Sequence, residues 1–178
     1  MTDSVYPPSE DSYLLRDAAV GEVRRDDTVL EVGTGSGFVA KALADEARTV
    51  VATDISNEAV RAARERGVSA VRTDLVAALD ARFDLVIFNP PYLPDDDTTP
   101  DDAMADALGG GETGREVAER FLDTVPRVLA PDGRILLVTS SLSGVEAFEE
   151  REGYEAERVA SERYFFEEVV VLRMRPTP

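Results

Sequence analysis

The chain has 178 residues, 43% of them hydrophobic, which is enough to bury the core of one globular domain. It contains neither Cys nor His, so disulfides, thiolate nucleophiles, histidine bases and the usual zinc ligands are excluded. The formal net charge of −17 disfavours a surface that binds nucleic-acid phosphates. It is typical of a protein from a halophilic source, because concentrated salt screens charge repulsion.

The polar, acidic N-terminus lacks the pattern of a signal peptide. No stretch approaches the roughly 20 apolar residues that a membrane-spanning helix needs. Neither a linker nor an internal repeat divides the sequence. We therefore expect one domain over residues 1–178, in the cytoplasm and without a membrane partner.

The first half of the chain alternates predicted helices with short apolar strands. In order, we predict a helix over 9–20, a strand over 28–32, a helix from 38 to about 46, a strand over 49–53, a helix over 57–66 and a strand over 68–72. Ser56 or Asn57 caps the third helix, and Gly67 ends it.

The second half continues the alternation and ends differently. We predict a strand over 84–88, a helix over 113–129, a turn at 131–133, a strand over 134–139, a helix from Ser143 to about 151, and an antiparallel hairpin of 154–160 with 165–174. Ser143 and Glu146 match a capping box. This order predicts an α/β fold, a Rossmann-like three-layer α/β/α sandwich whose seven-stranded sheet is mostly parallel and closes with a C-terminal antiparallel hairpin.

Residues 93–112 separate the two halves and contain six aspartates, two prolines and three consecutive glycines. A segment of this length in a small domain often has a function. We interpret its carboxylates as a solvated surface suited to salt, in preference to a metal or substrate site, and expect no metal ion.

The sequence Asn-Pro-Pro-Tyr at 89–92 follows the strand over 84–88 directly. Ligands of open α/β sheets bind beyond the carboxyl ends of the strands. Two consecutive prolines lack N–H groups and hold φ near about −65°, so the loop leaves the sheet stiff and extended. The Asn89 side-chain oxygen and the Pro90 carbonyl can then accept from an NH₂ group, with the Tyr92 ring against a flat substrate. The alternative is that Asn-Pro marks only a turn.

A glycine-rich sequence, Glu-Val-Gly-Thr-Gly-Ser-Gly at 31–37, connects the strand over 28–32 to the following helix. Glycines such as Gly33 and Gly35 allow the backbone to approach a nucleoside ligand closely. The loop also matches the dinucleotide pattern, so by itself it leaves NAD open.

Three carboxylates near this loop favour a different ligand. Asp54 ends the next strand, where a carboxylate can bind ribose hydroxyls. Glu31 suits a cationic amino group and is poorly placed near a pyrophosphate, and Asp74 can accept from an adenine NH₂. The set points to S-adenosylmethionine, against the alternative that these acids only cap helices.

The successive motifs resemble those of class I S-adenosylmethionine-dependent methyltransferases: residues 31–37, Asp54, Asp74 and 89–92. The Asn-Pro-Pro-Tyr form marks enzymes that methylate planar or exocyclic nitrogen. Residues 6–12 and 110–116 further resemble the archaeal and eukaryotic HemK-like branch, which modifies the glutamine of the Gly-Gly-Gln motif in class I peptide release factors. The resemblance extends from about Tyr6 to Arg173.

This resemblance implies the residues of the site. The cofactor contacts would be Ser12, Glu31, Gly33, Gly35, Asp54, Asp74, Leu75 and Asn89. The catalytic residues would be Asn89, Pro90 and Tyr92, which hold the substrate amide while a methyl group passes to its nitrogen.

The resemblance also implies partners, namely a class I release factor as substrate and a small zinc-binding methyltransferase activator as heterodimer partner. We expect the activator at the strand over 68–72, because this strand would be the last on its side of the sheet and an unpaired edge can be completed by another chain.

Three other functions remain open from the sequence. Adenine N6 methylation of DNA uses the same acceptor pair, but the acidity and the lack of a target-recognition domain argue against DNA as a partner. Protein lysine methylation is the second, although lysine does not need a pocket that recognises an amide. The third is a non-catalytic binding module that retains the fold for a partner.

Overall fold

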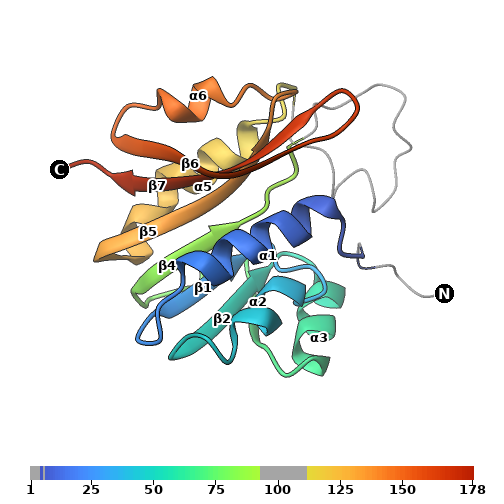
Figure 1. The fold of residues 1–178 in the computed structure, drawn as a ribbon. Helices are drawn as coiled ribbons and strands as arrows, with labels where there is room; N and C mark the ends of the chain where they lie inside the picture. Colours follow the sequence, from blue (N-terminus) through green and yellow to red (C-terminus); the bar gives the residue numbers. More distant parts are fainter. Residues whose placement is uncertain (1–4, 6, 93–111) are drawn as a thin grey trace.

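The computed structural model describes residues 5, 7–92 and 112–178 (Figure 1). Its strands are β1 (Thr28–Val32), β2 (Thr49–Asp54), β3 (Ser69–Arg72), β4 (Phe83–Phe88), β5 (Leu129–Ser140), β6 (Tyr154–Arg163) and β7 (Glu168–Pro176). The helices are α1 (Glu10–Glu22), α2 (Phe38–Leu43), α3 (Asn57–Glu65), α5 (Glu116–Thr124) and α6 (Glu146–Glu149), and a 3₁₀ turn, η1 (Val125–Val128), follows α5.

Among these residues the strands form one seven-stranded sheet in the order β3-β2-β1-β4-β5-β7-β6. The pairs from β3 to β5 are parallel, and β7 is antiparallel to both β5 and β6. Figure 1 shows α1, α2 and α3 in front of the sheet and α5 behind it. The predicted three-layer sandwich with a closing hairpin is confirmed.

The central strands are apolar at successive positions because helices cover both faces of the sheet. In β4, Leu85 and Ile87 pack with α1 and α2, while Val86 and Phe88 pack with α5, η1 and α6. A third cluster of small residues joins α3 to β2 and β3. The strand ends are thereby held in register, and the loops that follow them start from fixed positions.

Some predicted elements differ in the structure. The helix expected over 113–129 ends at Thr124, because Pro126 lacks an N–H and the chain continues as the 3₁₀ turn η1. The capping box expected at Ser143 is wrong. Its hydroxyl instead donates to the Ser140 carbonyl (3.0 Å), and Val145 precedes the short helix α6.

The turn predicted at 131–133 lies inside β5, where the register with β4 shifts between Phe83 and Leu85. A Cβ on Gly133 would lie 2.9 Å from the Ala130 carbonyl oxygen and 3.0 Å from that of Phe83, so glycine is required at this irregularity.

Arg134 of β5, which pairs with Leu85 at the opposite end of the sheet from the loops that carry the motifs, is 2% exposed. Its guanidinium donates to the Asp27 carboxylate (2.7 Å) and to the Asp84 carbonyl (3.1 Å), and it also contacts Glu22. Because Asp27 itself is 5% exposed, this is an ion pair shielded from water. It ties the end of α1 to the starts of β1, β4 and β5.

In the described part of the chain, no helix is both long and apolar enough to cross a bilayer.

Candidate active site

The predicted site residues follow the carboxyl ends of parallel strands and therefore lie along one edge of the sheet. Glu31 is in β1, with Gly33 and Gly35 in the loop after it; Asp54 ends β2; Asp74 and Leu75 follow β3; Asn89, Pro90 and Tyr92 follow β4. Only Ser12 comes from outside the strand ends, in the first turn of α1.

The glycine-rich loop has backbone angles that few other residues adopt. Gly33, Gly35 and Gly37 have φ of +62°, +53° and +76°. A Cβ on Gly33 would lie 3.1 Å from the Phe88 ring, and one on Gly37 would lie 2.9 Å from the Ala63 backbone. The loop can approach a ligand closely because it has no side chains at these positions.

Glu31 is buried beneath this loop and holds its shape. One carboxylate oxygen accepts from the Thr34 hydroxyl (2.5 Å) and from the Ala40 amide (2.9 Å) at the start of α2. Burial raises the pKa of Glu31 to about 8, the two hydrogen bonds lower it, and the nearby charge of Asp54 raises it. Glu31 is therefore a loop-organising carboxyl as well as the predicted contact for an amino group.

Asp54 connects the loop to the next strand. Its carboxylate accepts from the Gly35 amide and from the Ser56 amide, each at 2.9 Å. The Asp54 carbonyl accepts from Thr73 (2.9 Å), so β3 is tied to the same point. The contact of Asp54 with ribose hydroxyls stays a prediction. Its carboxylate lies beside Gly35 of the glycine-rich loop.

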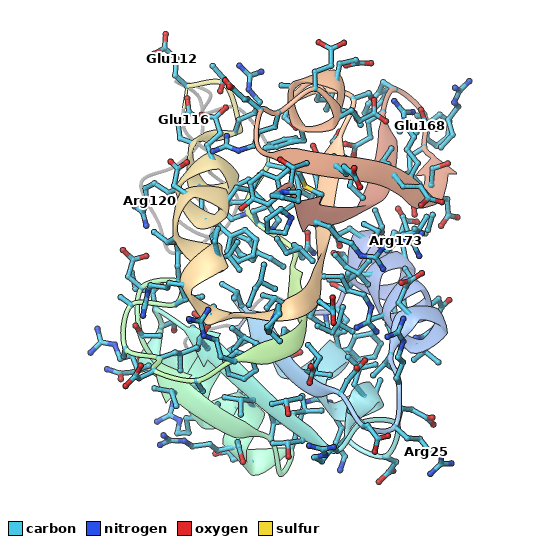
Figure 2. All side chains as sticks on the ribbon, turned by 90° about the vertical axis from the view of Figure 1, so that its left-hand side faces the viewer. Arg25, Glu112, Glu116, Arg120, Glu168 and Arg173 are labelled. Atoms are coloured by element: carbon cyan, nitrogen blue, oxygen red, sulfur yellow. The ribbon has the colours of Figure 1, made fainter. Side chains whose placement is uncertain are left out.

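Leu75 has a φ of +49°, the one positive value at a non-glycine residue in the described part of the chain. Its carbonyl accepts from the Thr53 hydroxyl (3.0 Å), which holds this strained turn against β2. Asp74, beside it, pairs with Arg120 of α5 at 2.7 Å, with both side chains more than half exposed. Figure 2 shows Arg120 on the outer side of α5.

Asn89 and Tyr92 are joined by a residue to which the sequence assigned no role, Asp11 of α1. One oxygen of the Asp11 carboxylate accepts from the Asn89 amide nitrogen (3.0 Å) and from the Tyr92 hydroxyl (3.1 Å). The other accepts from the Ser12 amide (2.7 Å). Pro90, between them in sequence, is buried.

The side-chain oxygen of Asn89 is buried and has no hydrogen-bond partner in the described structure. Leaving a buried acceptor unpaired costs about 1–3 kcal/mol, so a donor from water or from a bound ligand would stabilise this atom. Ser12 is adjacent, and its hydroxyl accepts from the Ser9 amide (3.3 Å) at the start of α1.

These groups fit S-adenosylmethionine. The glycine loop leaves space for close approach, and Glu31, Asp54 and Asp74 lie along the same edge of the sheet. Their contacts with the amino, ribose and adenine groups stay predictions. Within 5, 7–92 and 112–178, no three acidic side chains are grouped as a metal site; the aspartates of the segment 93–111 lie outside these residues.

Comparisons with known proteins identify the family of the chain. The family model of the methyltransferase small domain matches residues 14–166. A putative protein N5-glutamine methyltransferase of Methanocaldococcus jannaschii is 35% identical over 94% of this chain and 90% of its own length. The human methyltransferase HEMK2 is 38% identical over 76% of this chain and 71% of its own.

Among solved structures, the Mtq2–Trm112 complex of E. cuniculi, responsible for methylation of the eRF1 translation termination factor, superposes with a TM-score of 0.80. The identity is 31%, and the match covers 97% of this chain and 98% of the other. The fold and the site thus define a methyltransferase, and family membership implies S-adenosylmethionine as methyl donor. The chain belongs to the methyltransferase small-domain family, within the group of HemK-like N5-glutamine methyltransferases.

Sequence reasoning missed Asp11 and Arg120. Both contact predicted site residues from helices distant in the sequence, and helical periodicity carries no signal for such contacts. For Asp11 the sequence contained one signal. Asp11 lies within residues 6–12, which match a family motif, whereas the start of α1 needs only one capping residue from that stretch.

Proposed function

We propose that the chain methylates the N5 nitrogen of the glutamine in the Gly-Gly-Gln motif of a class I peptide release factor. The observation that carries this proposal is the buried, unpaired oxygen of Asn89 at the end of β4, beside the glycine-rich loop. A primary amide supplies the missing donor. The relatives named above, an N5-glutamine methyltransferase and a complex that methylates eRF1, support the same substrate class.

The residues of the site would work by orientation. An amide nitrogen is a poor nucleophile because its lone pair is delocalised into the carbonyl. Hydrogen bonds from its two N–H groups to Asn89 Oδ1 and the Pro90 carbonyl fix its direction and stabilise the positive charge that develops on nitrogen. When bound, S-adenosylmethionine supplies an electrophilic methyl group on its sulfonium sulfur.

The balance of the reaction needs no catalytic base. A bond would form between the glutamine nitrogen and the methyl carbon as the carbon–sulfur bond breaks, S-adenosylhomocysteine would leave, and the nitrogen would lose one proton to water. Orientation of the glutamine nitrogen by Asn89 and Pro90 would then supply most of the rate gain. The absence of His from the chain is consistent with such a mechanism.

The test is methyl transfer from labelled S-adenosylmethionine in high salt. Three substrates are compared: an archaeal release factor, the same factor with its Gly-Gly-Gln glutamine replaced, and adenine-containing DNA. Label on the first alone supports the proposal. Label on both release factors moves the target to another side chain, lysine included. Label on DNA alone overturns the proposal, and binding of S-adenosylmethionine without any transfer would favour a non-catalytic module.

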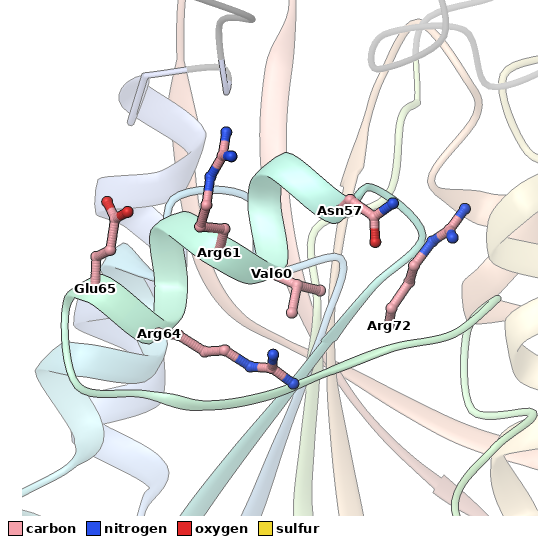
Figure 3. A pocket seen from close by; sticks show the side chains of 6 residues that line it. All are labelled: Asn57, Val60, Arg61, Arg64, Glu65 and Arg72. Carbon is pink, nitrogen blue, oxygen red and sulfur yellow. The ribbon is translucent and has the colours of Figure 1, made fainter.

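We further propose that β3 is the edge at which a small activator protein binds as a heterodimer partner. β3 is the terminal strand on its side of the sheet, and Val71 on it is 37% exposed. Beside it, between α3 and β3, lies a hollow of about 480 Å³ with Arg61, Arg64 and Arg72 around it (Figure 3). Three arginines in so acidic a protein suit an acidic partner.

The edge itself is partly occupied, since the Arg64 guanidinium donates twice to the Ala70 carbonyl, at 3.0 and 2.8 Å. A docking strand would therefore pair beside this arginine. Mtq2 was solved with Trm112, and this two-chain structure supports a heterodimer here.

The edge proposal is tested with Val71→Asp and the matched control Val20→Asp, whose valine is 44% exposed on α1. Val68 is unsuitable because it is 6% exposed within the third apolar cluster, so a charge there would unfold the region. Calorimetry with the activator should show weaker binding for Val71→Asp alone. Equal affinity of both variants would exclude β3 as the interface.

We also propose that residues 1–178 act as one domain and that it works in the cytoplasm, where release factors act. Its charge supports a halophilic setting.

A further inference from the structure

The contact between α1 and the loop after β4 depends on one carboxylate. Asp11 accepts from Asn89 Nδ2 (3.0 Å) and from the Tyr92 hydroxyl (3.1 Å) through a single oxygen. Its other oxygen accepts from the Ser12 amide at 2.7 Å and from the Ser9 hydroxyl. Both oxygens are therefore used, and the carboxylate is fixed to the first turn of the helix as well as to the loop.

The chemistry of Asp11 decides which way the Asn89 amide faces. An ionised carboxylate can only accept hydrogen bonds, whereas the two ends of an asparagine amide differ, one donating and one accepting. With the oxygen of Asn89 toward Asp11, two acceptors would face each other at hydrogen-bond distance. The nitrogen must therefore point to Asp11, and the oxygen must point away from it.

The oxygen turned away from Asp11 is the buried, unpaired atom of the site. If Asn89 were free to rotate by half a turn, its NH₂ group would meet the N–H groups of the substrate amide, and two donors would oppose each other. The glutamine amide would then no longer bind in the productive geometry, even though every residue of the Asn-Pro-Pro-Tyr loop remained in place.

We propose that Asp11 is a positioning residue that locks the Asn89 amide with its oxygen toward the substrate nitrogen and its nitrogen away from it. This inference rests on the proposed function, because it names the device that makes Asn89 an acceptor for an amide N–H. The same contact fixes Tyr92, whose hydroxyl shares the Asp11 oxygen. The first turn of α1 thus belongs to the substrate site as well as to the cofactor site.

The first experiment compares Asp11→Asn with Asp17→Asn in the release-factor assay. The asparagine side chain is nearly the same size as that of Asp11 but can donate, so the substitution permits the flipped Asn89. Asp17 is an exposed acid farther along the same helix, paired with Arg16, and serves as the control for charge. We expect kcat to fall about 10- to 100-fold for Asp11→Asn, the loss of one hydrogen bond to the reacting nitrogen. Asp17→Asn should keep the wild-type kcat.

A second measurement separates orientation from folding. The affinity for S-adenosylhomocysteine, measured by calorimetry, and the unfolding midpoint of Asp11→Asn should both stay close to the wild type. Loss of cofactor affinity in parallel with kcat would show that Asp11 only supports the fold of the site, and would overturn the proposal.

The exchanged pair gives the sharpest test. Asn89→Asp alone places two carboxylates against each other and should be nearly inactive. In the double variant Asp11→Asn/Asn89→Asp, the amide introduced on α1 donates to the carboxylate introduced after β4, which keeps an acceptor for the substrate. We expect the double variant to recover at least about tenfold in kcat over Asn89→Asp.

Losses that simply multiply in the double variant, or a kcat within twofold of wild type for Asp11→Asn, would contradict the locking role. Failure of the proposed function is distinguished from either result, because it would appear as absence of glutamine labelling by the wild-type enzyme itself.

Discussion

At the scale of single residues, the site contains polar side chains whose individual atoms have different roles. Asn89 donates to Asp11 with its nitrogen, and its buried oxygen has no partner in the described structure. Glu31 uses one oxygen to hold both Thr34 and Ala40, so the carboxyl that the sequence assigned to the cofactor is also part of the loop's framework. Changes at these positions therefore have separable effects on catalysis and on stability.

For Asn89, we predict that Asn89→Ala lowers kcat about 100- to 1,000-fold, because a hydrogen bond to the charge developing on nitrogen is lost. The affinity for S-adenosylmethionine should change much less, since several other residues are placed to contact the cofactor. Single-turnover methyl transfer and equilibrium binding measure the two quantities. Equal losses in both would argue that Asn89 serves mainly the cofactor.

For Glu31, we predict a pH-dependent contribution to stability. Its pKa is raised from 4.5 to about 8 in the folded protein, so folding favours the protonated form. This contribution is complete below pH 4.5 and is lost as the pH rises through about 8, which makes the free energy of unfolding fall over that interval.

Glu31→Gln should remove this slope, because Gln cannot ionise and still offers an oxygen to Thr34 and Ala40. Urea unfolding at several pH values and constant salt measures the slope, with the exposed Glu46→Gln as control. Identical slopes in wild type and Glu31→Gln would show that Glu31 ionises normally in the folded chain.

At the scale of elements, the sequence predicted the helices and strands whose bounds are set by hydrophobic periodicity and turn residues. Strands such as β1 (Thr28–Val32) were found at their bounds because apolar runs between turn residues define them. The helix before β5 was predicted too long because Val125 continues its apolar pattern, although Pro126 changes the backbone to a 3₁₀ turn. Pattern identifies burial better than it identifies backbone geometry.

In the candidate site, too, local patterns were predicted and contacts between distant residues were not. Motif residues at strand ends were placed together correctly, because parallel strands bring their carboxyl ends to one edge. The contacts of Asp11 with Asn89, and of Arg120 with Asp74, join residues 78 and 46 positions apart. Such contacts depend on how helices pack on the sheet, and one sequence contains no local pattern for them.

The ion pair of Arg134 belongs to this scale because it joins four elements at the amino ends of the strands. We predict that Arg134→Met lowers the free energy of unfolding by about 3–5 kcal/mol, since the buried carboxylate of Asp27 loses its partner. Arg48→Met, which removes an exposed pair at 3.8 Å, should cost about 1 kcal/mol or less.

Urea denaturation at fixed salt compares the two variants. The methyl-transfer rate per folded molecule of Arg134→Met should remain that of the wild type, because Arg134 lies at the opposite end of the sheet from the site. A loss no larger than that of Arg48→Met would show that water reaches the Arg134 pair.

At the scale of the whole molecule, charge sets the conditions under which the fold is stable. The chain has 36 acidic and 19 basic residues, so repulsion between carboxylates exceeds attraction. Several of the described ion pairs, such as Arg120 with Asp74, are half exposed and contribute little. Salt therefore weakens more repulsion than attraction.

We predict that the melting temperature rises by on the order of 5–10 °C between 0.1 and 2 M KCl, as the Debye length shortens. Calorimetry across a KCl series measures it. The rise should be smaller in a variant with several exposed acids changed to their amides. A melting temperature that stays level or falls with KCl would mean that the acidity does not limit stability.

The proposed function has a consequence for the product, because a primary amide would bring two N–H groups to the two proposed acceptors, Asn89 Oδ1 and the Pro90 carbonyl. After one transfer the nitrogen would have a single N–H, and one acceptor would be left without a donor, at a cost of about 1–3 kcal/mol. The methylated side chain would then bind less tightly than the unmodified one. Under the proposed function we therefore expect a monomethylated amide as the product.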